Sequence, residues 1–299
     1  MRNVGQAQYE AVFAAPSGRD KQVRMRRAHA SAARALLVTA SGPEVWVRRG
    51  RALGHRAGNS WLRVVSTPVA KQGGRTWEGT ALADTLVPRS VPRPRLRDLC
   101  DRTSGDHAYR AELTEYVTAP AVTGGGPALD RDVVLPDAWW ADLRTALATL
   151  ATVPTFRESV QQRWIDHNFR RFLGIDPLRI HDYTTGHSDV HWANLTDPPL
   201  VILDWEEWGR LPVGYDLGLL HAYSLAAPAT AARIRWEFAH VLDTPAGRAG
   251  ELVALGRLLQ VCGRGVHPRL APLLARRAEE LTGTPVPTPT PTPNATPTP

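Results

Sequence analysis

The feature that most constrains the fold is the segment at positions 187–194, His-Ser-Asp-Val-His-Trp-Ala-Asn, in which polar residues recur at close intervals. The residues before it are short and irregular, with a glycine at Gly186. The apolar run at 200–203 predicts a short buried strand that ends at Asp204. We therefore expect Asp189 on a loop, and a reversal of the chain that returns Asp204 to the same place.

Three side chains in this segment carry oxygen atoms at a spacing that suits phosphoryl transfer to a hydroxyl. Asp189 can accept the proton of an attacking alcohol, and Asn194 and Asp204 can hold a magnesium ion that bridges nucleotide phosphates. The pattern H-x-D-x-x-x-x-N is close to that of the protein-kinase catalytic loop. It also arises by chance, but Trp205 after Asp204 and a downstream Tyr-Asp-Leu make chance the weaker explanation.

The histidines of this region leave a second kind of site open. His181, His187 and His191 are of the residue type that binds zinc. However, no cysteine lies nearby, and carboxylate and amide oxygens favour magnesium. We expect His187 and His191 to brace the loop.

The motifs H-S-D-V-H-W-A-N-L, I-L-D-W-E-E-W-G and G-Y-D-L together resemble those of the aminoglycoside phosphotransferase family. The usual pattern of that family is H-G-D-x-H-x-x-N, then I-D-W, then D-L. The resemblance covers about residues 181–220. It implies an α+β, protein-kinase-like fold with a small antiparallel sheet lobe and a larger, mainly helical lobe. It also implies that Asp189 is the catalytic base, that Asn194 and Asp204 bind Mg²⁺, and that Asp216 holds the loop.

The rest of the chain divides in a way that suits two lobes. Alternating and apolar runs predict strands, and periodic apolar residues such as Trp139, Leu143 and Leu150 predict helices with a buried face. We expect strands at 35–39, 45–49, 61–65 and 111–117, and helices at 76–86, 137–150, 157–172, 218–226, 229–242, 250–261 and 270–281. The expected organisation is an N-terminal extension (1–34), a nucleotide-binding lobe (35–117), a catalytic lobe (118–282) and a disordered Pro/Thr tail (283–299).

The same resemblance implies an ATP site in the first lobe, with GTP as an open alternative. Arg63 stands on a strand where kinases carry a phosphate-binding lysine, Glu78 is its expected helix partner, and Lys71 is the alternative anchor. The loop at Ser41 and Gly42 would cover the phosphates. The backbone at Glu115 and Val117 would contact the adenine edge.

Composition narrows the classes of partner that the protein is expected to bind. The net charge is +7 and almost all of the positive charge is arginine, spread along the chain except for a cluster at 19–34. Since no nucleic-acid-binding motif accompanies it, we expect a solvated surface and no nucleic-acid partner. No apolar run is long enough to cross a membrane, and no secretory signal is visible. The two cysteines are far apart, so a reducing cytoplasm is the expected location.

The sequence thus predicts an ATP-dependent phosphotransferase that acts on a hydroxyl of a small molecule. Cationic aminoglycosides need an acidic pocket, which Asp182, Glu206 and Glu207 would line, while amino alcohols and sugars stay open as acceptors. Arg63 in place of lysine motivates the alternative, a pseudokinase that binds nucleotide or partners without turnover. The oligomeric state is not predicted.

Overall fold

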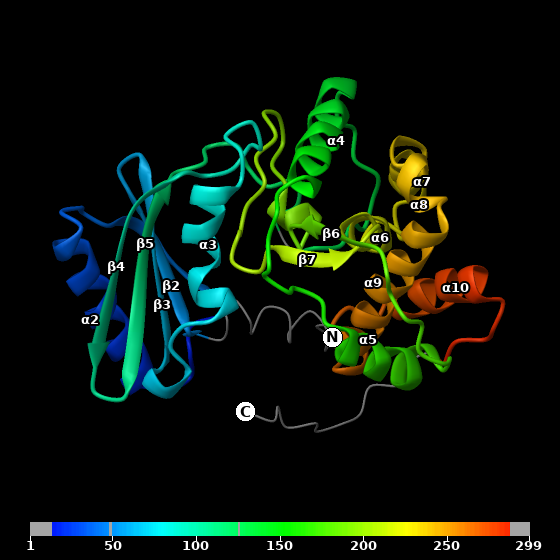
Figure 1. Ribbon diagram of the computed structural model, residues 1–299. Helices are drawn as coiled ribbons and strands as arrows, with labels where there is room; N and C mark the ends of the chain where they lie inside the picture. The colour runs from blue at the N-terminus through cyan, green and yellow to red at the C-terminus, as the bar shows by residue number, and fades with distance from the viewer. Residues whose placement is uncertain (1–13, 48–49, 125, 288–299) are drawn as a thin grey trace. The chain divides into compact units, whose positions relative to one another are not determined.

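The structure is a computed structural model that describes residues 14–47, 50–124 and 126–287 (Figure 1). The chain forms two compact units. Among the described residues, the first spans residues 14–85 and 93–118, and the second spans residues 86–92 and 119–287.

The first unit is built on a five-stranded antiparallel sheet. Its strands are β1 (Ser41–Val47), β2 (Ala52–Ala57), β3 (Ser60–Pro68), β4 (Leu96–Ser104) and β5 (His107–Glu115). Their order across the sheet is β1-β2-β3-β5-β4. The central strands β3 and β5 pair in a register that places Arg63 directly opposite Glu112.

Two tight hairpins fix this register. Gly58 and Asn59 connect β2 to β3, and Gly105 and Asp106 connect β4 to β5. Both glycines have a positive φ, 62° and 58°. Two-residue loops that begin with such a glycine match the twist of the flanking strands, so these dipeptides determine which residues face each other.

Helices α2 (Arg19–Ala35) and α3 (Arg75–Leu86) lie against opposite faces of the sheet (Figure 1). The alternation of side chains along a strand explains this arrangement. On one face, Leu62 packs with Met25 of α2 in the apolar core. On the other face, the Arg110 guanidinium donates a hydrogen bond to a backbone carbonyl in the first turn of α3.

The arginine cluster expected in an N-terminal extension belongs largely to α2. Arg24 donates hydrogen bonds to Ser66 and Tyr109, and Arg26 forms an ion pair with Glu44 at 2.6 Å. Residues 19–35 are thus part of the first unit, and at least two of their charges are engaged within it. Residues 1–13 of the expected extension lie outside the described residues.

The expected strands of this unit need correction. Residues 35–39 form no strand, because α2 continues to Ala35 and β1 begins only at Ser41. The range 50–59, for which no strand was expected, contains β2, in which the missing side chain of Gly54 leaves room for the Trp61 ring. Strand β4 was not expected, because it is an edge strand with mostly exposed side chains and little apolar alternation.

The second unit is mainly helical. Its helices are α4 (Asp137–Ala151), α5 (Gln162–Asn168), α6 (Tyr215–Ala222), α7 (Pro228–Glu237), α8 (Ala239–Leu242), α9 (Pro245–Gly263) and α10 (Ala271–Thr282). A two-stranded sheet of β6 (Tyr183–Gly186) and β7 (Gly209–Pro212) is set among them. The α+β architecture expected from the sequence is confirmed.

Helix α9 is the centre of this unit. It contacts α5, α6, α8 and α10, and most of its side chains are buried. Its start is well defined, since the Thr244 hydroxyl accepts a hydrogen bond from the Gly247 amide at 3.0 Å and Pro245 occupies the first turn. A helix that is buried along most of its length fixes the positions of the elements around it.

Several expectations for this unit are wrong in detail. The helix expected over 229–242 is divided into α7 and α8, and the helix expected over 218–226 ends at Ala222. The helix expected over 157–172 begins only at Gln162 and ends in a π-helical turn, Phe169–Leu173. The expected strand at 200–203 is reduced to a single bridge between Leu195 and Ile202. Pro198 and Pro199 precede that run, and they lack the N–H donors that a longer ladder requires.

The start of the proline-rich tail packs on the second unit. The Val286 side chain is buried, and its amide donates a hydrogen bond to Glu279 at 2.9 Å. Residues 288–299, which make up most of the expected tail, lie outside the described residues. None of the described helices has the length and apolar character that crossing a bilayer demands.

Candidate active site

The loop at 187–194 follows directly from β6, and a carboxylate on α6 holds its first turn. Asp216 accepts hydrogen bonds from the His187 amide at 2.6 Å and from the Ser188 amide at 2.8 Å. Gly186 allows this approach, because a Cβ there would lie 2.4 Å from an Asp216 oxygen. The backbone before Asp189 is therefore tied to a buried helix.

Two non-glycine residues in this segment adopt left-handed backbone conformations. Ser188 has a φ of 76° and Asp204 a φ of 61°. This region costs a residue with a side chain about 1–2 kcal/mol. Ser188 directly precedes Asp189, and Asp204 is itself an expected ligand of Mg²⁺, so both strained positions coincide with the candidate site.

Asp189 sits among groups that stabilise its negative charge. Its carboxylate lies 3.3 Å from His191 Nε2 and 3.7 Å from the Arg257 guanidinium. Partial burial alone would raise the pKa of Asp189, but these two neighbours bring it well below its usual value. Asp189 is therefore ionised at neutral pH, while one third of its side-chain surface stays exposed.

Asn194 is fixed beside Asp189. Its Nδ2 donates to the Asp189 carbonyl at 3.0 Å and reaches the Asp189 carboxylate at 3.4 Å. This orientation leaves the amide oxygen Oδ1 as the atom able to bind a cation. The Asn194 carbonyl also accepts a hydrogen bond from the Leu203 amide at 2.8 Å, which brings the segment before Asp204 back to the loop.

These donors fit a hard cation. Asn194 offers an amide oxygen, and Asp204 offers an exposed carboxylate. Oxygen ligands of this kind suit Mg²⁺, which keeps several water or phosphate ligands and needs few from the protein. Across the described ranges, no group of three or more His, Cys, Asp or Glu residues is placed to hold a metal, so the histidines do not gather into a zinc centre.

The two loop histidines differ in their surroundings. His187 is completely buried, and its ring meets the Trp205 ring edge-on at a centroid distance of 4.8 Å. Burial lowers the pKa of His187, so it stays neutral and fills space. His191 instead contacts Asp189 and packs edge-on against Tyr223, with centroids 5.7 Å apart.

In the first unit, Arg63 and Lys71 line one small cavity. The cavity also receives the basic side chains of Arg51 and Arg110 and the carboxylate of Glu112. Arg63 pairs with Glu112 at 2.9 Å, and the Glu112 side chain is almost completely buried. The two anchors that the sequence left as alternatives therefore share a basic pocket.

Glu78 lies in the first turn of α3 with its side chain exposed. Sequence analysis expected Glu78 to be the partner of Arg63. The structure adds Glu112, on the strand next to Arg63, as a carboxylate that holds the guanidinium. An exposed Glu78 therefore need not be the group that orients Arg63.

The other residues expected to contact the nucleotide lie in positions that differ from the expectation. Ser41 and Gly42 do not connect two strands, because they begin β1, whose connection to β2 runs through residues 48–51. Residues 48 and 49 lie outside the described residues. The Glu115 amide already donates to the Arg95 carbonyl at 2.9 Å, which leaves Val117 as the candidate for a backbone contact with a base.

The acidic residues expected around an acceptor are not equivalent. Glu206 is buried, Glu207 is half-buried, and Asp182 is exposed. A buried Glu206 fits the role of a brace better than that of a pocket wall. Glu207 and Asp182 remain able to meet solvent or a bound cation.

Sequence reasoning missed Arg257, which lies on α9. Its guanidinium donates to the Ser188 carbonyl at 3.1 Å and to the Tyr215 hydroxyl at 2.7 Å, and it lies near Asp189. It is one of many arginines on the later helices and belongs to no motif. Only the packing of α9 against the loop reveals it.

Comparisons with known proteins agree with this geometry at the level of the fold. No protein-family model matches the sequence. No curated protein matches it either. The structure, however, shares the two-lobed, protein-kinase-like fold of small-molecule phosphotransferases, as the sequence motifs implied.

Two solved structures illustrate the likeness. One is a thermostable mutant of aminoglycoside phosphotransferase APH(4)-Ia with AMP-PNP and hygromycin B, which is 12% identical with a TM-score of 0.50 and covers 83% of this chain and 94% of its own. The other is the amicoumacin kinase hAmiN with AMP-PNP, Ca²⁺ and Ami, also 12% identical with a TM-score of 0.50, covering 93% of each chain. At a sequence identity this low, the structural likeness establishes a common fold alone.

Proposed function

We propose that this protein is an ATP-dependent O-phosphotransferase that acts on a hydroxyl of a small molecule. The observation that carries the proposal is the loop in which Asp189 and Asn194 are hydrogen-bonded together and tied to α6 by Asp216. The fold adds support, since the two solved structures above bind AMP-PNP together with hygromycin B or Ami.

In the proposed reaction, the acceptor hydroxyl attacks the γ-phosphorus of ATP in line with the bond to the β-phosphate. A new P–O bond forms to the acceptor, the bond to the bridging oxygen breaks, and ADP leaves with that electron pair. Asp189 orients the hydroxyl and takes its proton. A carboxylate with a lowered pKa is a weak base, so it accepts the proton late, when the new P–O bond has already acidified the hydroxyl.

Asn194 and Asp204 are the residues that would hold Mg²⁺, which neutralises charge on the nucleotide phosphates when bound. Arg63 would contact the phosphates from the first unit, with Lys71 beside it in the same basic pocket. The acceptor class is small alcohols, including aminoglycosides, amino alcohols and sugars. A cationic acceptor would use the exposed Asp182 and the half-buried Glu207.

The decisive experiment compares wild type with Asp189→Asn. Release of ADP is measured with Mg²⁺ and either ATP or GTP, across a panel of aminoglycosides, amino alcohols and sugars. We expect turnover on at least one alcohol, and a fall in kcat of about 10²–10⁴-fold in Asp189→Asn, because the proton acceptor is lost. Nucleotide affinity, measured by calorimetry, should change little.

Asp176→Asn is the matched control, since Asp176 is an exposed aspartate away from the loop. It should keep wild-type turnover. Full activity of Asp189→Asn would refute the assignment of the base. Nucleotide binding without turnover on any alcohol would favour the pseudokinase alternative, which Arg63 at the lysine position motivates.

A further inference from the structure

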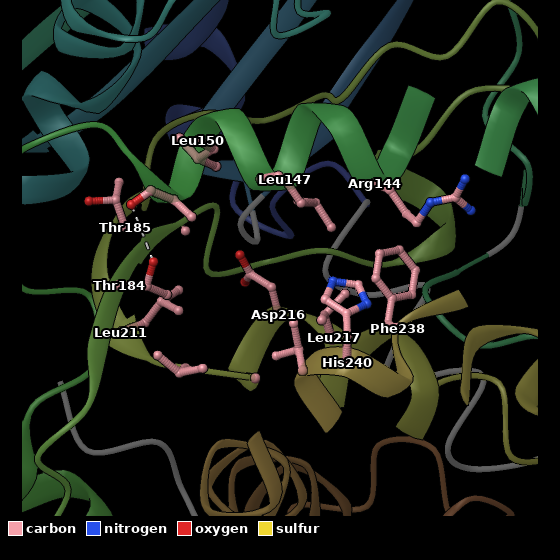
Figure 2. A pocket seen from close by; sticks show the side chains of 16 residues that line it. Arg144, Leu147, Leu150, Thr184, Thr185, Leu211, Asp216, Leu217, Phe238 and His240 are labelled. Carbon is pink, nitrogen blue, oxygen red and sulfur yellow. Dashed lines mark hydrogen bonds between the residues drawn. The ribbon is translucent and has the colours of Figure 1, made fainter. Parts of the chain in front are cut away.

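A cavity of about 170 Å³ lies within the second unit (Figure 2), and its lining includes Gly186, which directly precedes the candidate catalytic loop. Helix α4 forms one wall through Leu147 and Leu150, strand β6 forms another, and Leu217 and Phe238 close the opposite side. Most of this lining is apolar. A cavity of about 150 Å³ is large enough for a benzene ring, so this one has room for a ring with a short substituent.

The Asp216 carboxylate stands among these apolar side chains (Figure 2). Of the residues that line the cavity, all of them described, Asp216 is the only one with an acidic side chain. A carboxylate offers about four positions for hydrogen-bond donors. In the described part of the chain, the His187 and Ser188 amides supply two of them, so the carboxylate retains capacity for a further donor.

The other polar groups of the lining are less suited to bind a ligand. The Thr184 hydroxyl donates to the Ala151 carbonyl at 3.4 Å, and the Thr185 hydroxyl donates to the Val153 carbonyl at 2.5 Å. Arg144 forms an ion pair with Glu237, a buried glutamate, and His240 is exposed to solvent. Asp216 is therefore the group that selects among apolar molecules of the right size.

We propose that this cavity binds a small apolar amine, whose ammonium group donates a hydrogen bond to the Asp216 carboxylate while its apolar body lies against Leu147 and Leu217. The charge of the amine complements the one carboxylate of the lining. The apolar walls remove the body of the ligand from water. This inference is independent of the proposed phosphotransferase activity.

Binding at this position reaches the candidate catalytic loop through one side chain. The same carboxylate that meets the amine also accepts the two amide hydrogen bonds that fix the backbone before Asp189. A cation at Asp216 favours its ionised form, which is the better acceptor for both amides. Occupancy of the cavity therefore orders the backbone of the loop through Asp216.

The test uses benzylamine and toluene, which share an aromatic ring and differ in the amine. Binding to the full chain is followed at pH 8 by ligand-observed NMR, and the His187 and Ser188 amides are followed by protein NMR. We expect a Kd of about 1 mM for benzylamine, at a ligand efficiency ordinary for so small a molecule. Toluene should bind at least about 5-fold more weakly, and benzylamine should shift both amide signals.

Leu147→Trp fills the cavity and should weaken benzylamine binding by about 10-fold or more. Leu178→Trp, at an exposed leucine of the same unit, is the control and should bind as wild type does. Circular dichroism shows whether both variants fold. If Leu147→Trp does not fold, the comparison of benzylamine with toluene on wild type still tests the proposal. Equal affinity for toluene, or undiminished binding by folded Leu147→Trp, would overturn the proposal, as would no binding of benzylamine.

Since every readout is binding or a chemical shift, failure here is distinct from failure of the proposed function. A protein that transfers no phosphate would still bind benzylamine at Asp216. A protein that binds no amine would still be tested for transfer by Asp189→Asn.

Discussion

At the scale of single residues, the basic pocket of the first unit decides how a nucleotide phosphate would be held. Two N–H groups of Arg63 donate to one Glu112 oxygen, at 3.2 and 2.9 Å. This pairing fixes the guanidinium on the sheet. Lys71 is exposed in a short helical turn after β3, so its ammonium has more freedom to lose on binding.

We expect Arg63→Ala to weaken ATP binding more than Lys71→Ala does. A charge-assisted contact to phosphate contributes about 1.5–3 kcal/mol, which corresponds to roughly 10–100-fold in Kd. Lys71→Ala should cost less than about 5-fold, because a mobile, solvated cation gives up more on binding. Calorimetric titration with ATP and Mg²⁺ measures both.

Arg75→Ala at the start of α3 is the control for a general loss of positive charge in this unit. A larger effect for Lys71→Ala than for Arg63→Ala would reverse the assignment of the anchor. Equal and small effects of all three variants on ATP affinity would contradict the assignment of the basic pocket to the nucleotide site.

The residues of the loop show what sequence can and cannot predict at this scale. The spacing of Asp189 and Asn194 was sufficient to expect them in one place, because the motif is local, whereas the role of Asp216 was implied only by the family resemblance. The left-handed backbone of Ser188 was not predictable, since serine has no preference for it. The aminoglycoside phosphotransferase motif, which this segment resembles, has glycine at this position. The φ of 76° at Ser188 explains why glycine suits it.

At the scale of secondary-structure elements, one buried carboxylate joins four helices of the second unit. Glu251 on α9 is completely buried and contacts His221 on α6, Arg235 on α7 and Arg277 on α10. Arg277 approaches with two nitrogens, at 2.8 and 3.1 Å. Burial alone would raise the pKa of Glu251, but His221 and Arg277 lower it to about 2.

We expect Glu251→Gln to lower the free energy of unfolding by about 3–5 kcal/mol, because it leaves buried cations without their counter-charge. Glu280→Gln is the matched control, since Glu280 is half exposed and pairs with the same Arg277 at 2.9 Å. Its loss should cost less than about 1 kcal/mol. Urea unfolding followed by circular dichroism measures both, and similar costs for the two variants would contradict this account of the cluster.

The helices of this unit were largely predictable, whereas the partners of Glu251 were not. Periodic apolar residues indicated α4, α6, α9 and α10, because a helix that buries one face must repeat about every 3.6 residues. Strands β2 and β4 were missed, because glycine in the one and polar side chains in the other conceal the alternation. Contacts such as that between Glu251 and Arg277 join distant segments and leave no local pattern.

At the scale of the whole molecule, the fold persists where sequence similarity to the solved phosphotransferases is only 12%. Apolar periodicity and a few turn residues define two compact units, and many sequences satisfy such requirements. The specific requirements on residue type concern a few polar groups at the 187–194 loop. Among these, Asp216 carries a cost that the entire fold must offset.

That cost appears as a dependence of global stability on pH. Burial raises the pKa of Asp216 to about 7, although its two amide hydrogen bonds act in the opposite direction. In the unfolded chain the group titrates near its ordinary value of 3.8. Between these values the folded protein binds the extra proton, so Asp216 makes the free energy of unfolding fall as pH rises toward and through 7.

Four histidines act the other way over an overlapping pH range. Burial lowers the pKa of His29, His55, His187 and His267, so their contribution to stability rises with pH through 6.5, the ordinary value, and is nearly complete only at about pH 8. The Asp216 contribution is therefore isolated by comparing wild type with Asp216→Asn, in which the histidine contributions are the same. The lowered pKa of Glu251, about 2, acts only in acid and does not interfere.

Between pH 6.5 and pH 8 we expect the free energy of unfolding of wild type to fall by about 0.8 kcal/mol relative to that of Asp216→Asn, as a group of pKa about 7 in the folded state loses its proton. Urea unfolding of both proteins at steps of half a pH unit measures this difference. If that variant does not fold, the ¹³C shift of the Asp216 carboxyl in wild type gives the midpoint directly. A midpoint near 4 would contradict the prediction. Because the ionised carboxylate is the better acceptor for the two loop amides, phosphate transfer should rise across the same interval in which Asp216 loses its proton, with Asp189 already ionised throughout.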